Sequence, residues 1–167
     1  IQLSQEQSTS STSKDDNIVN GTIISEHRID DKDLVVTYKI TQNPGINTAG
    51  IKVLFDNSKF QISSVSNGKL FTEGSEWIAP DENELILSNQ AGEYSYIATR
   101  SENSDTFATT TIFEIRFNLV EGVTEADYEI TAEVIDGKFT NTSANTIDFG
   151  SIPSVTGNME ANGPAYK

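Results

Sequence analysis

The sequence predicts an all-β domain, an antiparallel β-sandwich with jelly-roll topology and about nine strands. The first observation is that short segments alternate apolar and polar residues, the period of a strand with one face against a core. The second is that clusters of Gly, Pro, Asn and Asp separate these segments, as turns require. The third is that no convincing amphipathic helix of normal length and no internal repeat is visible.

Composition limits the classes of function. The chain has 167 residues, enough for one domain that buries about 70% of the surface its unfolded chain exposes. It has no cysteine, which excludes a disulfide framework, a zinc–thiolate site and a thiol nucleophile. The net charge of -14 argues against nucleic acid and favours a basic partner or simple solubility in an extracellular medium. No apolar stretch approaches the about 20 residues that span a bilayer and no signal peptide is visible, so we expect a mature or excised segment without membrane insertion.

Both ends of the chain read as linkers. Residues 1–17 form a Ser/Thr-rich run without the apolar periodicity that would offset the entropy of ordering. Residues 151–167 are rich in Gly, Pro and Asn, so we expect a C-terminal tail or linker there. The predicted domain therefore covers residues 18–150.

The first strands precede residue 43. Residues 17–29 are rich in β-branched side chains that Asn20 and Gly21 interrupt, which fits either a hairpin or one kinked strand. A turn at residues 30–33 leads to a clear strand over residues 34–40. The carboxylates of this turn would suit calcium, but the loop lacks EF-hand spacing and we expect a solvated turn.

The central stretch, residues 48–70, reads as strand, tight turn, strand and turn. Ala49, Ile51, Val53 and Phe55 alternate with Gly50, Lys52 and Leu54, so they would face the core and the intervening residues would face solvent or a partner. A turn at residues 56–59 leads to a second strand over residues 60–65, in which the spacing of the apolar residues indicates a bulge.

Residues 75–79 and 84–89 are predicted as two short strands of a hairpin around a turn at residues 80–83. Residues 92–106 are polar and weakly patterned, and either a short strand or a helical turn fits residues 94–98. The longest strand signal covers residues 107–120, followed by an alternating strand at residues 128–134 and a last strand at residues 147–149.

Four of these stretches carry a family resemblance. They are AGIKVLFDNSKFQISSVSNGKLF at residues 49–71, ELILSNQAG at 84–92, FATTTIFEIRFNL at 107–119 and YEITAEVIDGKFTN at 128–141. In this order they resemble a cohesin module, the receptor domain with which scaffoldin proteins of fibre-degrading bacteria capture dockerin-bearing enzymes. The resemblance implies a nine-stranded jelly roll.

The resemblance also implies a binding site. The dockerin would lie on a sheet made of residues 49–56, 75–79, 84–89 and 128–135, on side chains that point away from the core. The implied contact residues are Thr48, Gly50, Lys52, Leu54, Trp77, Ile86, Ser88, Asn89, Glu129, Thr131 and Glu133. Trp77 belongs to this set only if Ile78 points inward; otherwise Trp77 joins the core. Many family members have Asn and Asp where Thr48 and Gly50 align, so the hydrogen bonds of those side chains are absent here. The connection at residues 92–106 is also longer than in the simplest members, so a divergent cohesin type with its own dockerin is expected.

The implied function is non-catalytic. Such a module captures dockerin-bearing proteins into a cellulosome, a multi-enzyme complex for polysaccharide degradation, and is extracellular, either secreted or attached to the cell surface through a larger scaffoldin. It would need no cofactor of its own, because calcium belongs to the dockerin, and it would bind no nucleic acid. We expect no catalytic or metal-ligating residue, since the single histidine, His27, lies between Glu26 and Arg28 in a surface-strand pattern.

Two alternatives share the predicted architecture. A carbohydrate-binding module would need Trp77, Tyr94 and Tyr96 in a coplanar exposed strip that stacks on sugar rings. A structural cell-surface sandwich would lack an outward apolar patch, whereas exposure of Leu54 and Ile86 would favour a protein receptor.

Overall fold

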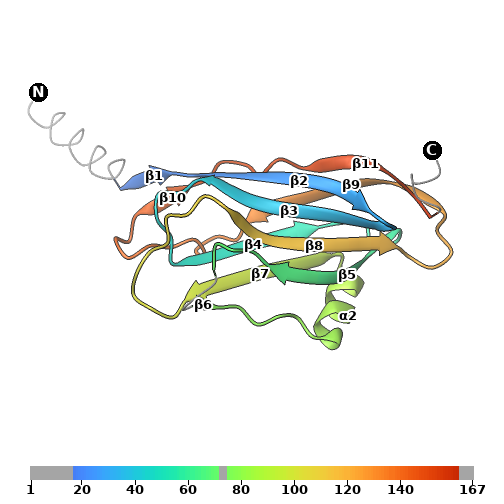
Figure 1. Cartoon of the computed structure of the whole chain (residues 1–167), viewed down its shortest axis with the longest axis horizontal. Coiled ribbons are helices and arrows are strands. Elements are labelled where there is room, and N and C mark those ends of the chain that lie inside the picture. Colours follow the sequence, from blue (N-terminus) through green and yellow to red (C-terminus); the bar gives the residue numbers. More distant parts are fainter. Residues whose placement is uncertain (1–16, 72–74, 162–167) are drawn as a thin grey trace, which may run out of the picture.

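The computed structural model describes residues 17–71 and 75–161, and these form a β-sandwich of two sheets (Figure 1). The four-stranded sheet has the order β2-β3-β8-β5, and the five-stranded sheet has the order β11-β9-β4-β7-β6. The first sheet consists of β2 (Thr22–Asp30), β3 (Asp33–Gln42), β8 (Thr111–Leu119) and β5 (Phe60–Asn67). The second consists of β11 (Val155–Glu160), β9 (Glu125–Val134), β4 (Thr48–Leu54), β7 (Glu93–Arg100) and β6 (Ser75–Glu76).

Every strand pair within these two sheets is antiparallel. The short strands β1 (Ile18–Asn20) and β10 (Thr146–Asp148) add a parallel pair at one end. The predicted all-β antiparallel sandwich is therefore confirmed. The chain passes from β1 to β2 at Gly21 and changes partner from β10 to β3, so residues 17–29 form a kinked strand and not a hairpin.

The core fills the space between the sheets with alternate side chains of each strand. At its centre three aromatic rings stack. The ring centroid of Tyr38 on β3 lies 5.1 Å from that of Phe113 on β8, and the Phe113 centroid lies 4.3 Å from that of Tyr96 on β7. The Tyr96 hydroxyl donates to the Asn67 side chain and to the Ile112 carbonyl oxygen, so the stack joins the two sheets by packing and by hydrogen bonds.

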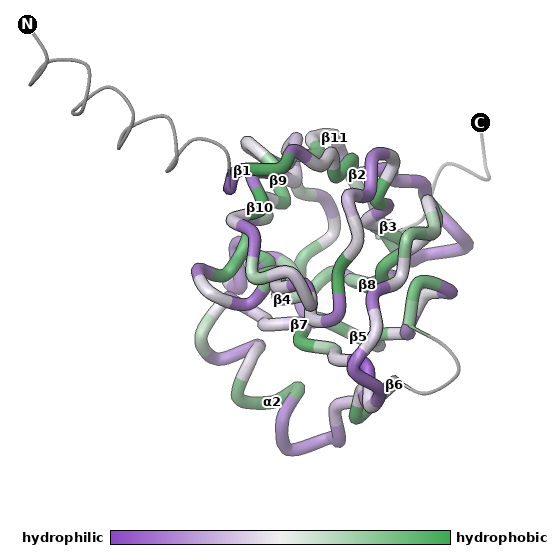
Figure 2. The backbone as a smooth tube through the Cα atoms, turned by 90° about the vertical axis from the view of Figure 1, so that its left-hand side faces the viewer, coloured by the Kyte–Doolittle hydropathy of each residue, from purple (hydrophilic) through white to green (hydrophobic). Residues whose placement is uncertain are grey.

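The hairpin predicted at residues 75–89 is wrong, because residues 84–89 belong to helix α2 (Glu82–Ala91). Asp81 caps the helix by accepting a hydrogen bond from the Glu84 amide at 2.8 Å, and Gly92 ends it in the left-handed conformation with φ 73°. The Asp-x-x-Glu spacing is a capping signature that favours a helix start. Figure 2 shows α2 below the two sheets, where it packs on β5 and β7.

The predicted domain end at residue 150 is also wrong. Residues Val155–Glu160 form β11, which pairs with β9 and extends the five-stranded sheet. Val155 and Met159 point into the core, so the sandwich continues to the end of this strand. Of the predicted linkers at residues 1–17 and 151–167, the parts at residues 1–16 and 162–167 lie outside the described residues.

Candidate protein-binding face

The outer face of the five-stranded sheet is the candidate site, and strand alternation decides which side chains it presents. On β9, Ala126, Tyr128, Ile130 and Ala132 are buried, so the residues between them point outward. The register places Lys52 of β4 between Ser95 of β7 and Glu133 of β9, and Leu54 between Glu93 and Thr131. The outward residues that carry the face are Lys52, Leu54, Glu93, Ser95, Ile97, Asp127, Glu129, Thr131, Glu133, Asn158 and Glu160.

This face has an excess of negative charge. In the described part of the chain its one ion pair joins Lys52 and Glu93, with Nζ 3.9 Å from a carboxylate oxygen. Asn158 donates to Glu125 and Asp127 at 2.9 and 2.8 Å, but a neutral amide removes no charge. Among residues 17–71 and 75–161, the carboxylates of β9 and β11 therefore have no ion-pair partner.

A hollow of about 370 Å³ lies on this face at the end of β4. It is lined by Leu54, Phe55, Asp56, Asp127, Glu129 and Thr131. Hydrogen bonds from the Ser58 hydroxyl and amide lower the pKa of Asp56 below its usual value, so its carboxylate stays charged. A hollow with an apolar wall and three carboxylates would suit a basic side chain of a partner.

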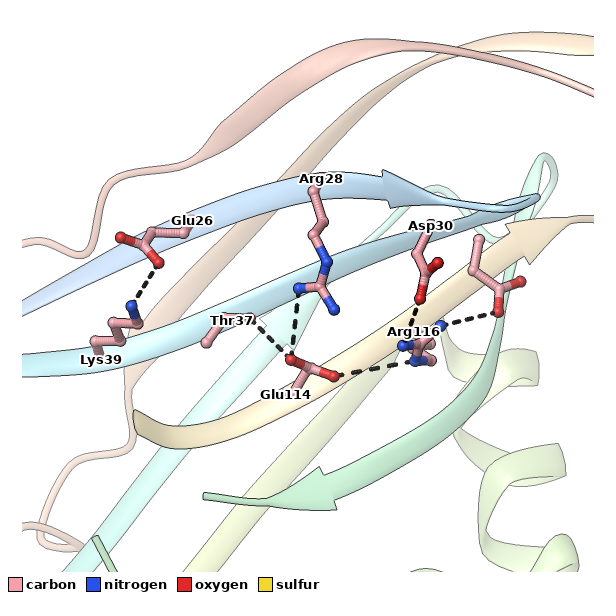
Figure 3. Close-up of polar contacts among 8 residues, drawn as sticks. Glu26, Arg28, Asp30, Thr37, Lys39, Glu114 and Arg116 are labelled. Carbon is pink, nitrogen blue, oxygen red and sulfur yellow. Dashed lines mark hydrogen bonds and ion pairs between the residues drawn. The ribbon is translucent and has the colours of Figure 1, made fainter. Parts of the chain in front are cut away.

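The outer face of the four-stranded sheet neutralises its own charges (Figure 3). Arg116 of β8 contacts Asp30 at 2.9 Å and Asp33 at 3.4 Å. The hydrogen bond that the Arg116 guanidinium donates to Asp30, followed by the coulombic attraction of that carboxylate, raises the pKa of Arg116 above its usual value. Two of the three predicted turn carboxylates are thus partners of an arginine, and no group of three or more potential metal-ligating side chains is present in residues 17–71 and 75–161.

Further pairs complete this ladder. Glu26 contacts Lys39 at 2.7 Å, and Glu114 contacts Arg28 at 3.7 Å while accepting a hydrogen bond from the Thr37 hydroxyl at 3.2 Å. Each surface pair contributes little to stability, on the order of 0 to 1 kcal/mol. This sheet therefore presents charges that are already matched within the domain.

Five of the predicted site residues lie together on the outer face of the five-stranded sheet: Lys52, Leu54, Glu129, Thr131 and Glu133. Thr48 lies at the end of β4, where its hydroxyl is 3.1 Å from that of Thr99. Gly50 points outward but is covered, because a Cβ there would overlap the side chain of Lys138 in the turn after β9. It therefore offers no open surface to a partner.

Three predicted site residues, Ile86, Ser88 and Asn89, are not on a strand. They belong to α2, and Asn89 has a structural role: its Oδ1 accepts from the Ile62 amide at 2.7 Å and its Nδ2 donates to the Ile62 carbonyl at 3.3 Å. Ile86 is 47% exposed, but it lies on α2 and not within the sheet. The prediction of outward side chains from strand alternation is wrong here, because these residues are helical.

Trp77 lies inward. Its ring lies 6.0 Å from that of Tyr96 and packs on the core, whereas Ile78 is 89% exposed. Burial, with a smaller contribution from Glu84, raises the pKa of Tyr94 to about 12 although a hydrogen bond with Trp77 acts in the opposite direction. Because Tyr94 and Tyr96 are buried, the exposed aromatic strip of a carbohydrate-binding module is not formed.

Sequence reasoning left one strand of the site open, since residues 94–98 fitted either a strand or a helical turn, and it missed a second strand at residues 155–160. β7 lies beside β4 and contributes Ile97, which is 46% exposed toward the β7 edge of the face. The signal was present, since Tyr94, Tyr96 and Ala98 alternate with polar residues, but the outward Ile97 disturbs the pattern. β11 was missed because its two buried residues are separated by Thr, Gly and Asn.

His27 takes part in no catalytic arrangement within the described residues. Its ring is exposed, and its Nδ1 lies 2.8 Å from the hydroxyl of Tyr128, which reaches it from the other sheet. Tyr128 in turn packs edge-on against Phe60 in the core. The pair therefore closes the seam between the sheets. Among the described residues, no helix has the length and apolar character to cross a membrane.

No protein-family model and no curated protein matches the sequence. Solved structures do match the fold. The seventh ScaB type I cohesin of Pseudobacteroides cellulosolvens aligns with a TM-score of 0.62 and 12% identity, covering 83% of this chain and 91% of that one. The sixth cohesin of Acetivibrio cellulolyticus scaffoldin B, solved with a Cel5 dockerin mutant, aligns with a TM-score of 0.59 and 15% identity over 85% and 100% of the chains.

A non-cellulosomal cohesin from the archaeon Archaeoglobus fulgidus aligns with a TM-score of 0.55 and 13% identity, covering 83% of this chain and 89% of that one. These proteins come from different organisms and differ widely in sequence from this chain, yet they agree in the arrangement of the two sheets. This chain therefore has the fold of the cohesin modules.

Proposed function

We propose that this domain is a non-catalytic receptor that captures a dockerin-bearing protein on the outer face of its five-stranded sheet. The observation that carries the proposal is the contrast between the two outer faces. Among the described residues, one face pairs its charges along β2, β3 and β8, whereas the other leaves the carboxylates of β9 and β11 without an ion pair beside Leu54. An apolar centre within a charged rim is the anatomy of a protein interface.

The chemistry of the face specifies a basic partner. Glu129 and Glu133 lie on β9 beside Leu54 and Lys52 of β4, so lysine or arginine side chains from a partner would meet unpaired carboxylates. Such complementarity accelerates association and selects among partners more than it adds raw affinity. A rigid sheet of this kind would bury a total area of about 1,200 to 2,000 Å² with a compact partner.

Similarity to cohesins solved with dockerins supports this class of partner, as an analogy at the level of the fold. In that setting the domain would belong to an extracellular or cell-surface scaffoldin and would assemble enzymes that degrade polysaccharides. Calcium would be required by the dockerin and not by this chain.

The test is calorimetry of the domain against a panel of dockerins in calcium, repeated with a chelator. We expect one-to-one binding that the chelator abolishes. Binding that persists without calcium, or silence across the panel together with binding to insoluble polysaccharide, would contradict the proposal.

Two variant pairs locate the site. Leu54→Asp should weaken binding by about 30-fold or more, whereas Leu87→Asp on α2 should not, although both place a charge at an apolar surface position. Glu133→Lys should weaken binding and reduce its salt dependence, whereas Glu121→Lys in the turn before β9 should change neither strongly. Circular dichroism must show the fold of each variant intact, because Leu54 is half-buried.

A further inference from the structure

The edge of the five-stranded sheet beside β7 is open over most of its length. β7 runs from Glu93 to Arg100, but β6 pairs with it only at Thr99 and Arg100. After Glu76 the chain leaves the sheet and continues to α2, as the ribbon in Figure 1 shows. Within the described residues no strand lies beside Ser95 and Ile97 on this side.

The register shows which backbone groups the open edge presents. Phe55 N donates to Gly92 O and Arg100 N donates to Asn47 O, at the two ends of the β4–β7 ladder. In an antiparallel ladder these bonded pairs recur at every second residue, so Tyr94, Tyr96 and Ala98 direct their backbone groups to β4. Ser95 and Ile97 therefore direct their amide and carbonyl groups away from β4, toward the open edge.

A groove of about 410 Å³ follows this edge. Its lining comes from β7, from the segment after β6 and from α2: Glu76, Trp77, Ile78, Glu84, Tyr94, Ser95, Ile97, Ala98 and Thr99. The walls are apolar, since Ile78 is 89% and Ile97 46% exposed and Trp77 is half-buried. The charged side chains of the lining, Glu76 and Glu84, are both acidic and exposed.

We propose that this edge accepts an extended segment of another protein, which adds to the sheet as a strand beside β7. Backbone pairing to Ser95 and Ile97 would supply the hydrogen bonds, as in other edge-strand complexes. Alternate side chains of the segment would meet the apolar walls and the acidic rim, so the segment that fits alternates apolar and basic residues. The inference goes beyond capture of a dockerin on the sheet face and does not depend on it.

The negative charge along this edge favours a segment of another protein over a second copy of this chain. Pairing two β7 edges would bring Glu76 and Glu84 of one copy against those of the other, in molecules that each carry a net charge of -14. Like charges across an interface oppose association. A basic segment instead converts the same carboxylates into favourable contacts.

The probe is a fluorescein-labelled peptide of about six residues in which isoleucine and lysine alternate. Fluorescence anisotropy measures its binding to the domain, and amide resonances of Ser95 and Ile97 report strand addition. We expect binding with slowed hydrogen exchange at these two amides. Two reference peptides serve as controls: one with the same residues in blocks, and one N-methylated on the amides of a single edge. Both should bind at least about tenfold more weakly.

The matched protein variants are Ser95→Pro and Ser95→Ala. Proline at this position removes an amide that faces the open edge but keeps the hydrogen bonds between β7 and β4 intact. The variant should therefore fold and bind the alternating peptide at least about tenfold more weakly. The alanine variant retains the amide and should bind within about twofold of the parent. If circular dichroism shows that Ser95→Pro does not fold, Ile78→Ser, which removes an apolar side chain of the groove without adding charge, takes its place with the same expectation.

Three results would overturn the proposal. The first is equal binding of the block or N-methylated peptide, which would show attraction to the acidic surface without strand addition. The second is unchanged binding to a folded Ser95→Pro or Ile78→Ser variant. The third is self-association of the free domain in sedimentation equilibrium that Ser95→Pro abolishes, which would assign the edge to a second copy. Dockerin binding tested with Leu54→Asp and Glu133→Lys is independent of all three.

Discussion

At the scale of single residues, Asn89 shows how a side chain can replace a strand. β5 is an edge strand with a bulge between Ile62 and Ser64, and unpaired edge groups invite unwanted pairing. The Asn89 amide group accepts from and donates to the backbone of Ile62, as a neighbouring strand would. Asn57 then donates to the carbonyls of Asn89 and Gln90 at 2.9 and 3.0 Å, which satisfies the end of α2.

We expect Asn89→Ala to lower the free energy of unfolding by about 1 to 3 kcal/mol, because the amide and carbonyl of Ile62 lose their partner at a part-buried position. Urea denaturation measures the change. Gln90→Ala is the control, since its side chain is exposed on the same helix. Equal stability of the two variants would show that water replaces Asn89 without cost.

At the scale of elements, α2 depends on its ends more than on an amphipathic face. None of its side chains is fully buried, and its three consecutive apolar residues, Leu85, Ile86 and Leu87, cannot all face the sheets. Isolated helices of this length are marginal in water. The cap at Asp81, the left-handed Gly92 and the contact of Asn89 with β5 therefore hold the helix in place.

Asp81→Ala should destabilise the domain by about 1 kcal/mol, because the Glu84 amide loses its capping acceptor. Amide hydrogen exchange should accelerate first within Glu82–Ala91, since the loss is local. Asp81→Asn retains an acceptor and should remain close to the parent in both measurements. Uniform acceleration across β3 and β8 in the alanine variant would instead assign Asp81 to the global fold.

At the scale of the whole molecule, the sandwich has two outer faces of opposite character around one aromatic core. Charged side chains form ion pairs on the outer face of β2, β3 and β8, whereas most carboxylates on the outer face of β4, β7, β9 and β11 have no ion pair among the described residues. Strand alternation places both sets of side chains on the outside. The same core makes the domain sensitive to alkali. Tyr38, Tyr94, Tyr96 and Tyr128 all have a pKa raised mainly by burial.

We expect four of the five tyrosines to resist ionisation near pH 10 in the folded domain. The pKa of each buried tyrosine is higher in the folded than in the unfolded chain. Its contribution to the free energy of unfolding is therefore complete below pH 10, the unfolded value, and is lost as the pH rises above it. Phenolate absorbance and loss of near-ultraviolet circular dichroism should therefore appear together in one transition. Reversible ionisation of most tyrosines near pH 10 with the fold intact would contradict this.

Local patterns determined the fold class and most of the strands. The alternation in β3, β4, β8 and β9 predicts a strand and its buried face together, because a side-chain period of two needs no knowledge of neighbours. For this reason Lys52, Leu54, Glu129 and Glu133 were correctly predicted to point away from the core. The capping signature at Asp81 was also local, but the apolar run after it fits a strand or a helix equally well.

The tertiary structure decided the rest, since it depends on which segments meet. β11 forms because β9 offers it an edge, Gly50 is lost from the site because the turn at Lys138 lies over it, and Asn89 leaves the site because β5 binds its amide. The balance of charge on each face was likewise invisible in the sequence, where Arg116 lies far from Asp30. Sequence thus determined what each strand buries, and contacts between distant segments determined which surface remained for a partner.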